Sequence, residues 1–268
     1  MKWLLAVGTV LAAGSAALAQ DAKPGDAKPG DPAKMEAKQP ETKPAENLPT
    51  GEALFEKHVK AIGGMEAMKA EKNRMVRAKY IGPGEMGEGM LRVLRVPPNK
   101  MYQTLEIPGV ITQEVWCNGE EGWMRDTSNG THRLQADSLV EYKRQADYFG
   151  EANYKARYKE LKTTGAEKFN GVDAYAVRAV PTEGKERTLY FDAKSGLMIG
   201  IRTPGTSGPE SDSITTFGEY KKFGEVMQPT AFSTKSKNST SSITILEIRT
   251  DLTTMPSVEP PDEVRSVK

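Results

Sequence analysis

The chain has 268 residues, of which 37 are basic and 36 acidic, and it contains a single cysteine. The formal net charge of +1 gives too weak a field to steer a nucleic acid or an anionic membrane surface, which argues against both as general partners. A lone cysteine leaves no intramolecular disulfide, so the folded part must be held together by burial alone.

Residues 1–19 have the features of a cleavable signal peptide. Lys2 supplies a positive charge, an apolar stretch follows, and Ala17-Leu18-Ala19 fits the small-x-small cleavage pattern. The apolar stretch is shorter than the roughly 20 residues that a membrane-spanning helix needs. We therefore predict export to the periplasm of a Gram-negative-type envelope, cleavage near Gln20 and no transmembrane segment in the mature chain. An uncleaved N-terminal anchor is the alternative.

Residues 20–49 form a segment rich in Pro, Lys, Ala and Glu. It repeats Asp-Ala-Lys-Pro-Gly twice and contains no aromatic residue. Such a segment cannot bury enough apolar surface to offset the entropy lost on ordering it. We predict a disordered tether, which serves either as a plain spacer or as a contact with an envelope polymer.

The predicted folded domain, residues 50–254, opens with a helix. Thr50 is its expected N-cap and Gly63-Gly64 its expected end. Apolar residues recur between them at helical spacing, and a second, short helical piece is expected over residues 65–70.

From residue 76 onward the apolar period changes from 3.6 to 2, which predicts strands with one buried face. Turns built on Pro, Gly and Asn separate the strands and are short enough to imply antiparallel neighbours. A helix is expected within the sheet over about residues 136–149, and the tail 255–268 is expected to be irregular. The predicted strands span residues 76–80, 90–96, 101–107, 110–117, 122–126, 158–166, 174–181, 187–191, 197–203, 214–223, 230–235 and 242–250.

These elements predict a mainly β domain with helices (α+β), built on a curled antiparallel sheet. A sheet of about a dozen strands curls or closes, and helices that fill its concave side incompletely leave a cavity. The apolar side chains that we predict to line this ligand-binding cavity are Leu54, Phe55, Val59, Ile62, Tyr80, Val93, Leu105, Val115, Leu139, Phe149, Leu189 and Phe191.

Four sequence segments resemble those of one protein family. Residues 53–64 are similar to the leading helix of LolA-like exported proteins, the outer-membrane lipoprotein-sorting proteins of Gram-negative bacteria. The segments 118–123, 189–197 and 220–229 resemble three of its hairpins and turns, in the same order. Each phrase is built from common turn chemistry, and it is their order and spacing over residues 52–250 that carries the resemblance.

The resemblance implies an unclosed antiparallel half-barrel wrapped over a leading helix and an inserted helix. It also implies an apolar interior that accommodates acyl chains of a lipoprotein. No binding residue of the family transfers position by position.

The histidines and the cysteine give no indication of a catalytic site. His58 and His132 are far apart in sequence and have no partner at metal-ligand spacing, so no metal site or cofactor is predicted. We interpret His58 as structural or solvated, and Cys117 as a small buried hydrophobic residue rather than a nucleophile. The 12 methionines fit ordinary core packing and also fit a cavity that accepts chains of variable shape.

The sequence therefore predicts a non-enzymatic, monomeric periplasmic carrier that shelters an apolar ligand, such as a lipid or a lipoprotein acyl chain. Envelope proteins are its expected further partners. A ligand-free envelope scaffold is the alternative, and a packed interior would favour it. A hydrolase is the third reading, which a Ser or Asp clustered with His132 would favour.

Overall fold

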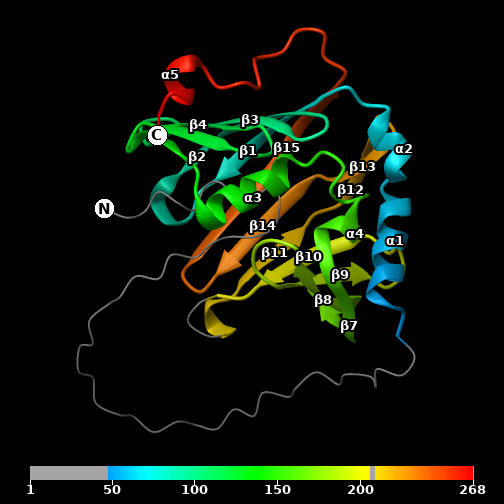
Figure 1. Cartoon of the computed structure of the whole chain (residues 1–268). Coiled ribbons are helices and arrows are strands. Elements are labelled where there is room, and N and C mark those ends of the chain that lie inside the picture. Colours follow the sequence, from blue (N-terminus) through cyan, green and yellow to red (C-terminus); the bar gives the residue numbers. More distant parts are fainter. Residues whose placement is uncertain (1–47, 206–208, 268) are drawn as a thin grey trace, which may run out of the picture.

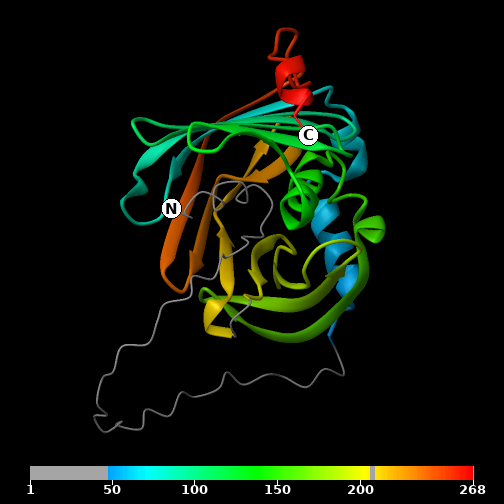
Figure 2. The same cartoon turned by 60° about the vertical axis from the view of Figure 1, so that its left-hand side comes forward.

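The computed structural model describes residues 48–205 and 209–267. The predicted signal peptide, and all of the predicted tether except residues 48–49, lie outside these residues. Helices lie on the concave side of one strongly curved sheet, and a further short helix lies on its convex side (Figures 1 and 2). The helices are α1 (Gly51–Ala61), α2 (Gly64–Lys69), α3 (Ala136–Ala146), α4 (Tyr154–Arg157) and α5 (Asp262–Arg265), with 3-10 turns at Gly84–Met86 and Pro209–Ser211.

The main sheet has 13 strands, all paired with antiparallel neighbours. They are β1 (Arg74–Ile81), β2 (Glu88–Val96), β3 (Lys100–Ile107), β4 (Ile111–Cys117), β5 (Gly122–Asp126), β6 (Gly130–Arg133), β7 (Tyr158–Phe169), β8 (Val172–Pro181), β9 (Arg187–Asp192), β10 (Met198–Thr203), β11 (Ser213–Phe217), β14 (Ala231–Ser236) and β15 (Ser239–Thr250). A separate two-stranded ribbon consists of β12 (Tyr220–Phe223) and β13 (Val226–Pro229).

The order across the main sheet is β6-β5-β4-β3-β2-β1-β15-β14-β11-β10-β9-β8-β7. The two end strands, β6 and β7, do not pair with each other, so the sheet is an unclosed half-barrel. This confirms the predicted fold class. Figure 2 shows the two halves of the sheet facing each other across the interior, with α3 between them and α1 along one side.

The predicted start of α1 is confirmed. Thr50 accepts a hydrogen bond from the backbone N–H of Ala53 at 3.2 Å, which satisfies one of the free donors of the first turn. The Thr163 hydroxyl donates to the carbonyl of Pro49 at 2.6 Å and ties the entry of the helix to β7. Within the described chain, no helix combines the length and apolar character that crossing a bilayer requires.

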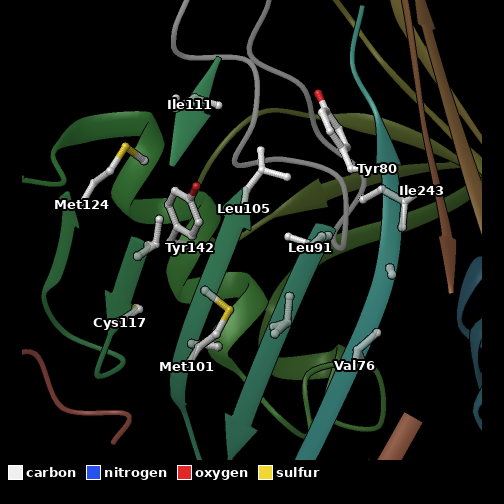
Figure 3. Close-up of a cluster of buried hydrophobic side chains, with 14 of the residues drawn as sticks. Val76, Tyr80, Leu91, Met101, Leu105, Ile111, Cys117, Met124, Tyr142 and Ile243 are labelled. Atoms are coloured by element: carbon white, nitrogen blue, oxygen red, sulfur yellow. The ribbon is translucent and has the colours of Figure 1, made fainter. Parts of the chain in front are cut away.

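Two apolar cores occupy the concave side. The first core consists of buried residues of β1 to β5, Leu134, α3, β14 and β15, and it includes Tyr80, Val93, Val115 and Tyr142. Figure 3 shows the ring of Tyr142 beside Leu105 within this core. The second core consists of residues of α1, α4 and β7 to β10. Each core fills one half of the curved sheet, and each is covered by a different helix, α3 for the first core and α1 for the second.

The inserted helix is shorter than predicted. It ends at Ala146 rather than near residue 149, because Asp147 takes an extended conformation and the N–H of Tyr148 donates to the carbonyl of Pro98 at 2.9 Å. Phe149 therefore leaves the face of α3 and packs against a third cluster around Ile62 and Met68. The single turn α4 that follows carries no apolar period long enough to predict.

The predicted strand 214–223 is two strands, β11 and β12, separated at Gly218. A side chain at Gly218 would place its Cβ 3.0 Å from the Cβ of Ala231, so the two chains approach closely there and glycine suits the position. The ribbon β12–β13 then reaches the helical end of the molecule, where the N–H of Met227 donates to the carbonyl of Ile62 at 3.0 Å.

The C-terminal tail is not wholly irregular, contrary to the prediction. Its helix α5 lies against the convex face of the sheet (Figure 1). There Val264, which is fully buried, packs with Trp116 and Trp123. A helix of four residues held by a single apolar anchor offers no periodicity for sequence analysis to detect.

Candidate ligand-binding cavity

A cavity of about 110 Å³ lies on the concave side where the first core and the second core meet. Phe217, which packs against both cores, forms part of its wall. The other apolar residues of the wall are Phe55, Met68, Met198, Ile201, Met227, Pro229 and Phe232. The cavity therefore touches the apolar interior of both halves of the sheet.

Five arginines also line this inner cavity, and we call them the arginine cluster. They are Arg74, Arg95, Arg144, Arg157 and Arg187. Only two acidic residues, Asp147 and Glu151, line the cavity with them. The wall is cationic as well as apolar.

The strand register explains two of these positions. Arg74 on β1 lies directly opposite Arg95 on β2, and the next inward pair along the two strands is Val76 with Val93. Because side chains alternate between the faces of a strand, both arginines point to the concave side that the valines occupy. The other three come from α3, from the end of α4 and from the start of β9. The cluster thus joins five elements from both halves of the sheet.

Acidic partners neutralise most of the cluster. Glu71 accepts hydrogen bonds from Arg74 at 2.9 and 2.5 Å, and it also accepts one from the Tyr148 hydroxyl at 2.5 Å. The remaining pairs are Glu141 with Arg144 and with Arg187, both at 3.7 Å, and Asp147 with Arg157 at 3.4 Å.

Arg95 differs from the other four arginines. Among the described residues it forms no ion pair, and its Nε atom is buried without a hydrogen-bond partner. Burial, and then the charge of Arg74, lower its pKa to about 10. The pKa of Arg144 is also lowered to about 10, first by burial and then by Arg187. Both guanidinium groups remain charged at neutral pH, so the cavity wall carries positive charge at a cost in desolvation.

A second, outer cleft of about 390 Å³ adjoins the inner cavity. The two share Arg144, Asp147 and Arg157 in their walls. The Arg157–Asp147 ion pair therefore stands between the outer cleft and the inner cavity. Beyond it the cleft is bordered by turns of both halves of the sheet, at Asn99 and at Glu183.

Similar folds occur among solved structures. A DUF1329 family protein from Desulfovibrio piger aligns with a TM-score of 0.55 at 12% identity, over 78% of this chain and 96% of that one. A LolA superfamily protein from Nitrosomonas europaea aligns with a TM-score of 0.55 at 13% identity, over 81% and 97% of the two chains. The chain has a LolA-like fold. A putative outer membrane lipoprotein-sorting protein domain from Vibrio parahaemolyticus also aligns, with a TM-score of 0.50 at 12% identity, over 75% and 95% of the chains.

No protein-family model matches the sequence, and no curated protein matches it. The LolA-like fold is thus recognised from the structure, and the identities of 12 to 13% establish the fold alone. What this chain binds has to be argued from its own residues.

The 12 predicted cavity residues lie in three packed clusters. Tyr80, Val93, Leu105 and Val115 lie in the first core, with Leu139 against it. The second core contains Leu54, Phe55, Leu189 and Phe191, with Val59 against it, and the third cluster contains Ile62 with Phe149.

Of these residues, only Phe55 lines the inner cavity, and only Phe149 lines the outer cleft. That the 12 residues contact a ligand stays a prediction. Sequence analysis missed the arginine cluster altogether. One signal was available, since Arg74 and Arg95 stand at inward positions of strands that otherwise alternate with apolar residues.

The candidate catalytic residues His58 and Cys117 are both packed in the interior. His58 is buried in α1, and its Nδ1 atom accepts a hydrogen bond from the N–H of Met198 at 3.1 Å. Burial lowers its pKa, against a smaller opposing effect of Glu151. Cys117 is a buried free thiol of the first core whose pKa burial raises, as its interpretation as a small hydrophobic residue requires. Among the described residues, no hydrogen bond joins either histidine to a nucleophile or a carboxylate.

Proposed function

We propose that this protein is a non-enzymatic carrier that binds the acyl chain of a lipid or lipoprotein inside the half-barrel, in the periplasm. The observation that carries the proposal is the way α3 covers the first core. A helix that can be displaced from an apolar concave face exposes a surface that suits an acyl chain.

The helix α3 covers the first core with few fully buried residues. Only Tyr142, Gln145 and Ala146 of its 11 residues are buried. The hydroxyl of Tyr142 is buried without a hydrogen-bond partner among the described residues, and so is the hydroxyl of Tyr80 in the same core. Each such group costs about 1–3 kcal/mol in the docked state. Docking of α3 is therefore less favourable than its apolar contacts alone would make it.

The size of the inner cavity supports a displacement of α3 when an acyl chain binds. Pockets for drug-sized ligands have about 300–1,000 Å³, and the inner cavity has about 110 Å³. The inner cavity alone is too small for a long acyl chain, so in this proposal α3 leaves the concave face to admit the chain. Its methylenes then lie on first-core residues such as Val93 and Leu105, where each buried CH₂ contributes about 0.8 kcal/mol.

The similarity in fold to the putative outer membrane lipoprotein-sorting protein domain from Vibrio parahaemolyticus supports this proposal. The competing function is a ligand-free scaffold, and the observation that favours it is the packed state of the first core, in which Val93 and Val115 are at most 1% exposed. The two functions differ in a single measurable property, which is whether the interior opens to an apolar ligand.

A titration of the delipidated mature protein with a fluorescent fatty acid tests the proposal. We expect one ligand per chain by native mass spectrometry and a Kd in the micromolar range or tighter, about −8 kcal/mol or stronger. Amide exchange should show reduced protection of α3 in the complex, because the acyl chain replaces the helix on the sheet. If no fatty acid, phospholipid or acylated peptide binds saturably, the carrier function is wrong and the scaffold takes its place.

A further inference from the structure

Positive charge collects at one end of the concave face, and its placement is unusual for a protein interior. Arg74 and Arg95 are direct cross-strand neighbours on adjacent strands. Like charges in this position repel each other, and the next inward pair of the same strands is apolar. A fold that needed only a packed core would place apolar residues at both positions.

The acidic residues nearby leave this charge incompletely balanced. Glu71, Glu141, Asp147 and Glu151 are the carboxylates that pair with or lie beside the five arginines. Four of the arginines share three of these acids in ion pairs within 4 Å. Arg95 is the fifth, and the acid that acts on it, Glu151, does so only at longer range. Counted over residues 48–205 and 209–267, the cluster therefore has one more positive charge than it has carboxylates.

A ligand group of matching charge and size would complete the cluster. The inner cavity of about 110 Å³ is several times the roughly 10–15 Å³ that one water molecule needs, so it has room for a carboxylate or a phosphate group. Guanidinium groups donate paired hydrogen bonds that match both of these oxyanions. The apolar wall formed by Phe217 and Phe232 lies at the same cavity and leads into the first core.

We propose that the arginine cluster binds the acidic headgroup of the carried lipid, a carboxylate or a phosphate, so that the protein selects anionic lipids over neutral ones. This inference rests on the proposed carrier function for the acyl chain. Arg95 supplies the unpaired charge, and the chain continues from the cavity onto the concave face beneath α3. The headgroup thereby sets the orientation of the ligand in the half-barrel.

Three probes with the same palmitoyl chain test the selection: lysophosphatidic acid, palmitate and monopalmitoylglycerol. We expect the two anionic probes to bind at least about tenfold more tightly than the neutral glyceride, because charge-assisted hydrogen bonds to arginine are lost in the glyceride. The preference should shrink as salt concentration rises, since an ionic contact reached from solvent is screened. Equal affinity for all three probes would overturn the inference and leave the carrier function intact.

The variant Arg95→Met identifies the residue responsible. It should lose the anionic preference by about tenfold, keep its affinity for monopalmitoylglycerol, and unfold at a denaturant concentration no lower than the wild type, because the replacement removes a buried unpaired charge. Arg92→Met is the matched control, since Arg92 lies on the outer face of the same strand, and it should leave the preference unchanged. A preference that survives Arg95→Met would assign selection to another group and refute the role of Arg95.

Inorganic phosphate alone separates this inference from the proposed function. One possible result is saturable phosphate binding that depends on Arg95, with no lipid bound by the same protein. This result would support an anion site at the arginine cluster, but it would overturn the carrier function and the lipid headgroup as the occupant of the site. Phosphate that competes only with the two anionic lipids is the result we expect.

Discussion

The buried hydroxyl of Tyr142 offers a direct test of the displaceable helix. Tyr142 is 3% exposed, it projects from α3 into the first core, and its hydroxyl has no partner among the described residues. The substitution Tyr142→Phe removes that hydroxyl and keeps the ring. An unsatisfied buried hydroxyl costs about 1–3 kcal/mol, so the variant should be more stable by about 1 kcal/mol or more. The docked position of α3 gains the same amount.

In the proposed binding mode an acyl chain displaces α3, so the gain in stability should appear as a loss in affinity. A shift of about 1.4 kcal/mol corresponds to a tenfold weaker Kd. Urea denaturation measures the first effect, and titration with a fluorescent fatty acid measures the second. Thr104→Val is the matched control, since Thr104 also has a buried hydroxyl without a described partner but lies on the outer side of β3. If Tyr142→Phe is more stable and binds the fatty acid with unchanged or greater affinity, α3 does not compete with the ligand.

Three further expectations follow from packing and charge. Val93→Trp overfills the first core, where Val93 is 1% exposed, and should lower the free energy of unfolding by about 1–3 kcal/mol in urea; unchanged stability would indicate empty space there. Val264→Ala should lower the stability by about 1–2 kcal/mol and increase quenching of Trp116 and Trp123 by acrylamide without changing lipid binding, because α5 loses its anchor. Burial lowers the pKa of His58 below 6.5 in the folded protein. Between that lowered pKa and pH 6.5 the folded state therefore holds fewer protons than the unfolded state, so the free energy of unfolding falls as the pH falls. His58→Gln lacks this loss, so the stability difference between wild type and variant should narrow below pH 6.5; a constant difference would show that the histidine is not held neutral.

Much of the sheet could be predicted from sequence, because the signal for a strand is local. Val76, Ala78 and Tyr80 alternate with polar residues, and this alternation already assigns their face. The short elements α4 and α5 could not be predicted, since four residues contain no full period. Phe149 was misplaced for a related reason: its spacing from Ala146 continues the helical pattern, and only the hydrogen bond from Tyr148 to Pro98 ends the helix.

The meeting of all five arginines was beyond prediction for a different reason. The members of the cluster are spread from residue 74 to residue 187, and charged residues on strands and helices are ordinarily solvated. What makes them a site is the curvature of the sheet, which brings the start of β1 and the start of β9 to one cavity. Sequence alone specifies that the sheet is wide enough to curl, but the residues that meet across the curved interior depend on how far it curls.

The helix α3 and the arginine cluster together address a difficulty that any acyl carrier faces, which is the slow release of a tightly buried chain. A chain with roughly 14 buried methylenes gains about 11 kcal/mol at about 0.8 kcal/mol each, which corresponds to a Kd of about 10 nM and slow release. In the proposed carrier, burial of the chain competes with the apolar contacts of α3, so the net affinity is lower by the free energy of docking that helix. The headgroup then contributes the part of the affinity that depends on charge. A partner that supplies another cation, or that withdraws the headgroup from Arg95, would need to overcome only this charge-dependent part of the binding free energy. The helix α3 would then close over the first core and expel the chain.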